Sequence, residues 1–120
     1  MKKGHNFREL KIWQESMKMV KAVYFLTSGL PVEEKFGLIS QMNRCSVSIP
    51  SNIAEGSGRT SEKEFLHFLR ISLSSSYELE TQLILTEDLF EINVSSVLVG
   101  VHNLQLMIGA FIRRLNENPS

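Results

Sequence analysis

A proline lies deep inside a helical pattern near the middle of this chain. The stretch from Arg44 to Gly56 reads R-C-S-V-S-I-P-S-N-I-A-E-G, with Pro50 well inside it. Proline has no amide proton to give to a helix, and its ring crowds the carbonyl four residues earlier, here that of Ser46, at a cost of roughly 3 kcal/mol. A chain that keeps such a residue uses the bend or surrounds it with neighbours that offset the cost. We therefore expect a second helix that is kinked at Pro50.

The spacing of apolar residues predicts four helices, at about residues 7–28, 32–56, 61–89 and 94–116. Within each segment apolar residues recur at intervals of three and four, which places them on one helical face. Helices joined by turns this short run up-down-up-down. We therefore expect residues 1–120 to form one all-α domain, a four-helix bundle.

The expected helix ends follow from capping residues. Asn6 with Glu9, and Ser61 with Glu64, have the spacing of capping boxes. Gly29 suits a left-handed residue after the first helix. The expected core faces are Leu10, Trp13, Met17, Val20 and Tyr24; Ile39, Met42, Ser46, Ile49 and Ile53; Phe65, Leu69, Ser72, Ser76, Leu79 and Leu83; and Val97, Val101, Leu104, Ile108, Phe111 and Leu115.

A second set of apolar residues lies off these faces. Its members are Phe25, Leu26, Phe68, Leu73, Leu85, Leu98, Leu106 and Ile112. A bundle of this size buries three or four positions per heptad on each helix, so part of this set is ordinary core. The excess predicts that a further helical face meets another subunit, and we expect a homo-oligomer.

Charge is balanced in total but not along the chain. There are 13 basic and 13 acidic side chains, and residues 1–60 carry an excess of positive charge that residues 61–120 offset. The two halves either neutralise each other side by side or present a basic face to an anionic partner. The single cysteine, Cys45, fits a reducing compartment. With no signal peptide and no membrane span visible, we expect a cytoplasmic protein.

No set of residues indicates catalysis. Glu64-x-x-His67 has the spacing of a di-iron half-site, but the matching second pair is missing, since Val99 stands three residues before His102. Cys45 has no readable histidine partner. We therefore expect a protein that is not an enzyme, with no metal, no cofactor and no small-molecule substrate.

A polar cluster accompanies the proline. Arg44, Ser48, Asn52 and Glu55 alternate with apolar residues around Pro50. One interpretation is a structural network that satisfies the carbonyl freed by Pro50 and joins helices or subunits. The other interpretation is a ligand site.

Small residues in the third helix are expected to receive the bulge at Pro50. Ser72 and Ser76 lie one turn apart on its core face. Side chains this small let two helices approach closely, so we expect a notch at this point.

The stretch Arg44–Gly56 resembles the central signature of the 23S rRNA intervening-sequence protein family, a family of bacterial four-helix bundles. Supporting matches run over nearly the whole chain: Phe7 with Leu10 and Trp13, Leu30-Pro31 with Glu34, Gly37-Leu38 with Gln41, Glu64-Phe65 with Phe68-Leu69, and Ser76 with Glu78-Leu79-Glu80. Cys45 and Ser46 stand where the family tends to have small residues such as alanine.

The resemblance implies a left-handed up-and-down bundle that assembles as a ring, a pentamer. It carries over no catalytic residue. The chain is also similar to accessory proteins of diversity-generating retroelements, which are strongly basic pentamers that bind nucleic acid and a reverse transcriptase. It departs from them in its net charge of zero.

Together these observations suggest a binding or scaffold module associated with RNA or a nucleoprotein. The candidate nucleic-acid-binding residues are Lys11, Lys18, Lys21, Arg44 and Arg59. The alternative is a protein-partner adaptor with no nucleic-acid binding, whose acidic residues Glu78, Glu80, Glu87, Asp88 and Glu91 face a basic protein.

Overall fold

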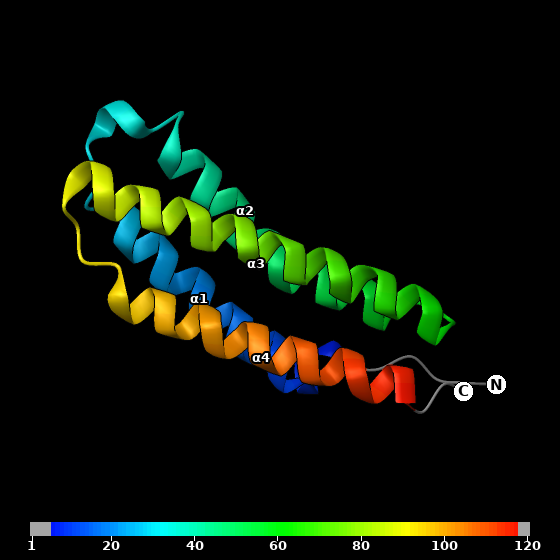
Figure 1. Cartoon of the computed structure of the whole chain (residues 1–120). Helices are drawn as coiled ribbons and strands as arrows, with labels where there is room; N and C mark the ends of the chain where they lie inside the picture. Colours follow the sequence, from blue (N-terminus) through cyan, green and yellow to red (C-terminus); the bar gives the residue numbers. More distant parts are fainter. Residues whose placement is uncertain (1–5, 118–120) are drawn as a thin grey trace.

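The computed structural model describes residues 6–117 and is all-helical over that range, with no strand among those residues. Its long helices are α1 (Lys11–Thr27), α2 (Leu38–Ser57), α3 (Glu62–Phe90) and α4 (Ser95–Glu117). Two short 3₁₀ helices, η1 (Phe7–Glu9) and η2 (Val32–Glu34), precede α1 and α2. The long helices lie side by side in a body of 51 × 21 × 20 Å (Figure 1). Both α1 and α3 pack against α2 and against α4.

The first two helices start later than the sequence predicts. Leu10 takes an extended conformation and separates η1 from α1, so no continuous helix begins at residue 7. The side chain of Asn6 caps η1 by accepting from the amide of Arg8, while the amide of Glu9 donates to the backbone carbonyl of Asn6. Gly37, with φ −105° and ψ −116°, likewise separates η2 from α2. Both predicted helices therefore split into a short 3₁₀ turn and a longer α-helix.

Helix termini follow side-chain capping in two places and depart from the usual pattern in two others. The hydroxyl of Ser61 accepts from the amide of Glu64 at 3.1 Å, as the capping box predicts. Asn93 accepts from the amide of Ser95 at 2.9 Å before α4. The end of α3 is unusual, because Glu91 adopts a left-handed φ of 54° where glycine is normally found. The predicted left-handed stop at Gly29 is wrong, since its φ is not positive.

The core faces of α2, α3 and α4 agree closely with the predicted ones. Met42, Ile49, Leu69, Leu79 and Ile108 are completely buried. Phe111 and Leu115, at the far end of α4, are half-buried. Apolar periodicity was sufficient to find these faces because each of these helices has one dominant apolar stripe.

The predicted face of α1 is wrong. The buried positions of α1 are Ile12, Ser16, Met19, Val23 and Thr27. The predicted residues lie one position further along, a rotation of about 100°; four of them are half-buried and Tyr24 is exposed. The reason is that α1 carries apolar residues on two adjoining faces, so two stripes fit the same period.

Small buried serines occupy several positions in the interior of the structure. Ser16, Ser46 and Ser76 are fully buried, and each hydroxyl donates to the carbonyl three residues earlier in its own helix. Small side chains whose hydroxyls are bonded to their own helix let neighbouring helices come close without leaving a polar group unpaired. Ser72 differs, because its hydroxyl donates across to the carbonyl of Ile49 in α2 at 2.5 Å.

Candidate functional site

The Arg44–Gly56 signature lies entirely within α2, and Pro50 is inside the helix and buried. The bond from Ser72 reaches the residue directly before the proline. Ser72 of α3 therefore contacts α2 beside the proline, whereas Pro50 itself lines a hollow shared with α1, so a notch that receives the bulge at Pro50 stays a prediction.

Gly56 ends the signature at a close contact with α3. A Cβ atom placed on Gly56 would lie 2.7 Å from Cβ of Phe68 and 2.9 Å from Cδ1 of Phe65. Real Cβ atoms do not come this close to carbon, so only glycine allows α2 and α3 to meet here. The role of this signature residue is structural.

The four residues of the predicted polar network lie along α2. Asn52 donates from Nδ2 to the carbonyl of Ser48 at 2.8 Å, and the hydroxyl of Ser48 donates to the carbonyl of Cys45 at 2.7 Å. Glu55 pairs with Arg59 at 2.6 Å. These bonds run along α2 and into the turn after it, so a role of the cluster in satisfying the Ser46 carbonyl stays a prediction.

A polar groove of about 470 Å³ lies between α2 and α3 beside this cluster. Its lining includes the predicted residues Arg44 and Ser48, together with Glu78 and Gln82. Cys45 also lines it; burial raises the pKa of this thiol to about 11, and the thiol donates to the carbonyl of Ser75 at 3.0 Å. Cys45 is therefore a neutral, structural thiol at physiological pH.

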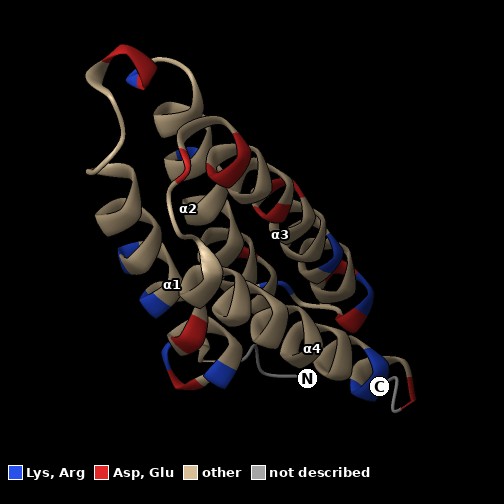
Figure 2. Ribbon diagram, turned by 60° about the vertical axis from the view of Figure 1, so that its left-hand side comes forward, with Lys and Arg blue, Asp and Glu red and all other residues tan. Residues whose placement is uncertain are grey.

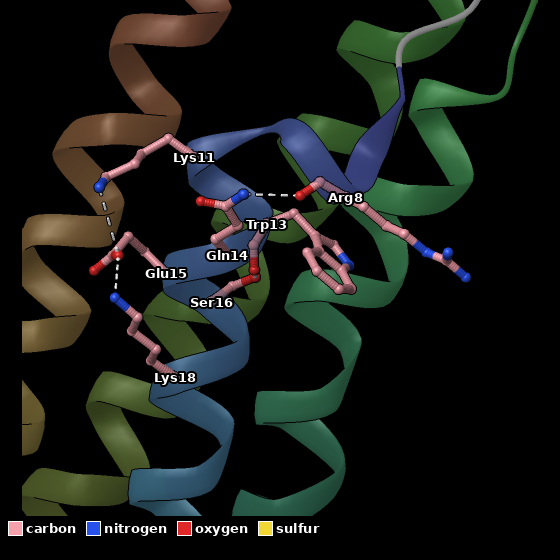
Figure 3. Close-up of polar contacts among 7 residues, drawn as sticks. All are labelled: Arg8, Lys11, Trp13, Gln14, Glu15, Ser16 and Lys18. Atoms are coloured by element: carbon pink, nitrogen blue, oxygen red, sulfur yellow. Dashed lines mark hydrogen bonds and ion pairs between the residues drawn. The ribbon is translucent and has the colours of Figure 1, made fainter.

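The candidate RNA-binding lysines share one helix. Figure 3 shows Lys11 and Lys18 on either side of Glu15, at 3.9 and 3.0 Å from its carboxylate. The hydrogen bond from Lys18 holds the pKa of Glu15 below its ordinary value. Lys21 is exposed one turn further on. One carboxylate thus offsets part of the charge of this basic ridge, which we define as Lys11, Lys18 and Lys21.

The two candidate arginines lie elsewhere. Arg44 is exposed in the middle of α2, and Arg59 follows the end of that helix. The guanidinium of Arg59 lies 4.8 Å from the ring centroid of Phe68, besides its pair with Glu55. A single copy of the chain therefore does not gather the five candidates into one cluster.

Sequence reasoning missed a second basic group around Arg59. Lys63, His67 and Arg70 line a hollow of about 560 Å³ with Arg59, Phe68 and one acidic residue, Glu64. Their spacing of three and four along α3 places them on one helical face, which is the signal that would have found them. Over residues 6–117, no three histidine, cysteine or acidic side chains are grouped closely enough to hold a metal ion.

The acidic residues of the predicted adaptor surface divide into separate places. Glu80 accepts from Nε2 of Gln105 at 2.9 Å and contacts His102 at 3.2 Å, so it joins α3 to α4. Glu78 lines the polar groove with Arg44. The remaining three, Glu87, Asp88 and Glu91, lie at the end of α3.

Apolar side chains remain uncovered on two sides of α1. Between α1 and α2, a groove of about 360 Å³ is lined by Trp13, Met17, Val20, Val47, Pro50, Ser51 and Ala54, which we call the α1–α2 groove. Of the off-face apolar residues, Phe25, Leu85 and Leu106 are exposed and the other five are half-buried. Leu26, Leu73, Leu98 and Ile112 pack against the core, so part of the set is ordinary core, as expected, and the exposed members are the ones left for another subunit.

The sequence as a whole supports a family assignment. A search of curated proteins found no match to the chain. The family described as 23S rRNA-intervening sequence protein matches residues 8–108, which include all of the Arg44–Gly56 signature and most of every long helix. The chain therefore belongs to the 23S rRNA-intervening sequence protein family.

Proposed function

We propose that this protein is a non-enzymatic, homo-oligomeric scaffold that associates with RNA or a nucleoprotein in the bacterial cytoplasm. We propose further that its four helices form a left-handed, up-down-up-down bundle with α2 kinked at Pro50, and that the oligomer is a ring of five. Membership in the family supports this proposal.

The α1–α2 groove is the observation that carries self-assembly. Trp13, Met17 and Val20 form an apolar stripe that the single copy leaves half-exposed, and Val47 beside them is 39% exposed. Covering such a stripe with a partner would stabilise the assembly by roughly 25 cal/mol for each Å² of apolar surface removed from water. Exposed, contiguous apolar surface of this kind marks protein interfaces.

The basic ridge of α1 supports association with RNA. A ring would bring several copies of the ridge close together and strengthen a field that is modest in one copy. Phosphate contacts by lysine make binding steeply dependent on salt.

Self-assembly is tested with two valine variants. Light scattering after gel filtration should show an oligomer for the natural chain and a monomer for Val47→Glu, because a buried unpaired carboxylate is costly. Val99→Glu is the control, since Val99 is 60% exposed on α4 and does not line the α1–α2 groove. An oligomer that survives Val47→Glu unchanged would refute this interface.

RNA association is tested by filter binding to a structured RNA at several salt concentrations. The double variant Lys18→Gln and Lys21→Gln should lower the slope of log K against log salt by about one for each phosphate that a lysine no longer neutralises. Lys35→Gln, in the connection between α1 and α2, is the control. If the natural chain binds no RNA at low ionic strength, the RNA part of the proposal fails.

A protein-partner adaptor without RNA binding is the alternative. Pull-down from cell extract with and without nuclease separates the two, because a partner held through RNA is released by nuclease. Retention of every partner after nuclease would favour the adaptor.

A further inference from the structure

The helix α4 is an unusually uncharged surface helix. From Ile92 to Ile112 the sequence contains no lysine, arginine, aspartate or glutamate. By length and apolar content α4 would suffice to span a membrane, yet it packs against α1 and α3, and only 22% of its most apolar stretch is buried. A solvent-facing helix normally carries charge on its outer face. The lack of charge on α4 indicates a surface that another molecule covers.

A continuous groove runs between α1 and α4. Two hollows of about 210 and 490 Å³ share Ala22, Ser96 and Val97 and so join into one, which we call the α1–α4 groove. It extends from Met107 back to Ile92, 15 positions along the chain, or about 22 Å at the rise of an α-helix. That length fits about four turns of a docked helix.

One end of the α1–α4 groove is acidic. Glu91 directly precedes Ile92 of the groove, and Glu87 and Asp88 lie in the turn before it. Glu33 and Glu34 of η2 belong to the same end of the molecule, where Figure 2 shows acidic segments in both helix connections. Lys18 and Glu15 line the opposite end of the groove and pair with each other at 3.0 Å. The groove therefore has an acidic end and an opposite end at which the charges balance.

We propose that the α1–α4 groove binds an amphipathic helix of a partner protein, with the basic N-terminal turn of that helix at the acidic end. Apolar side chains at positions i, i+3, i+4 and i+7 would lie against Phe25, Leu26 and Val97, the usual mode of helix-in-groove recognition. The positive end of the helix dipole would face Glu91, and the negative end would lie away from the acidic end. This polarity selects one orientation of the docked helix.

Charge decides between possible occupants. RNA would be repelled by the carboxylates at the acidic end, and its backbone gains nothing from an uncharged groove. An identical copy that placed its own acidic end there would meet like charge, and a copy that presented a different surface is one of the outcomes tested below. A basic, amphipathic protein helix satisfies both parts of the groove. This inference does not depend on RNA binding or on the α1–α2 groove.

The test uses two labelled synthetic peptides of 16 residues. Both carry leucines at helical spacing; one has four lysines in its first turn and the other has them in its last turn. Fluorescence anisotropy with the full chain should show saturable binding of the first peptide, about threefold or more tighter than the second. Equal affinities, or no saturable binding of either peptide, would overturn the proposal.

Two pairs of variants locate the site. Ala22→Trp fills the groove and should weaken binding about tenfold or more, whereas Ser74→Trp, on an exposed position of α3, should not. Glu91→Gln should reduce the advantage of the first peptide, whereas Glu9→Gln at the other end should not. Equal effects within either pair would contradict the assignment.

Backbone amide shifts of the natural chain provide a measurement that needs no variant. Added peptide should shift residues 22–29 and 92–107, and shifts confined to α2 and α3 would overturn the proposal. Two further outcomes would do the same. In the first, both the peptide and the Ala22→Trp substitution dissociate the oligomer into monomers, which would mean that a second copy occupies the groove. The other is co-sedimentation of the chain with phosphatidylcholine vesicles through α4.

Discussion

Replacing Gly56 by alanine should destabilise the protein, because α2 and α3 leave no room for a methyl group. The new Cβ would lie 2.7 Å from Cβ of Phe68 and 2.9 Å from Cδ1 of Phe65. Carbon atoms prefer separations of about 3.5–4.0 Å, so one of the two helices would have to move by about 0.8 Å. Phe65 is 2% exposed and belongs to the core, which restricts that movement.

The magnitude follows from two opposing effects. Overpacking of a well-filled interior costs about 1–3 kcal/mol. Alanine regains up to about 1 kcal/mol of helix propensity over glycine, and less at Gly56, next to the last residue of α2. The net loss should be about 1–2 kcal/mol, which lowers Tm by about 4–8 °C in a chain of this size. Thermal unfolding followed by circular dichroism measures it, at one protein concentration because assembly shifts Tm.

Gly100 offers the matched control. It lies inside α4, and a Cβ placed there meets no atom within 4 Å. Gly100→Ala should therefore raise stability by about 0.5–1 kcal/mol through helix propensity alone. If Gly56→Ala raises Tm as Gly100→Ala does, the close contact between α2 and α3 is not what selects glycine at the end of the signature.

Three further predictions test the interior and its titratable groups. Ser76→Leu should lower the free energy of unfolding by about 1–3 kcal/mol through overpacking, and an unchanged urea midpoint would contradict the notch facing α2. Cys45, whose pKa is raised to about 11, should react with iodoacetamide at pH 8 about tenfold or more slowly in the folded than in the urea-unfolded chain, as followed by mass spectrometry. The hydrogen bonds from Gln105 and His102 hold the pKa of Glu80 below its ordinary value, so its stabilisation is complete above about pH 4.3 and is lost as the pH falls through the lowered pKa. Urea titrations between about pH 6 and 3 measure the free energy of unfolding at each pH. This free energy should fall less with decreasing pH in Glu80→Gln than in the natural chain, and the same fall in both would refute the linkage.

Apolar periodicity predicted the helices and most of the core because three of the four helices have one clear apolar stripe. Leu69, Leu79 and Ile108 are examples in which spacing alone placed the residue correctly. It failed for α1, where Ile12 and Trp13 begin two stripes of equal quality. Only the packed structure shows that the stripe of Ile12, which includes the small Ser16, faces inward.

Local chemistry predicted some helix ends and missed others. Ser61 caps α3 through a side-chain bond that its sequence context makes visible. The left-handed Glu91 was not visible, because the usual glycine signal is absent there and the chain adopts the strained conformation at a glutamate.

The candidate site was less accessible to sequence reasoning than the fold. Lys11 and Lys18 were found as basic residues, but their shared contact with Glu15 depends on the rotamers that α1 allows. The α1–α4 groove needed the structure, since residues 75 positions apart in the sequence, such as Ala22 and Val97, form it together. Periodicity describes one helix at a time and does not report what lies between two of them.

The helix α1 is the element on which all the proposed contacts converge. Its inner stripe, with Ile12 and Val23, packs in the core, and Trp13 and Ala22 each form a wall of one groove. The remaining outer face carries the basic ridge. A helix that is apolar over so wide an arc cannot be satisfied by two neighbours in a single chain. We infer that α1 is the helix that assembly completes, and that a self-contact on one side and a partner helix on the other leave Lys11 and Lys21 of the basic ridge open to RNA.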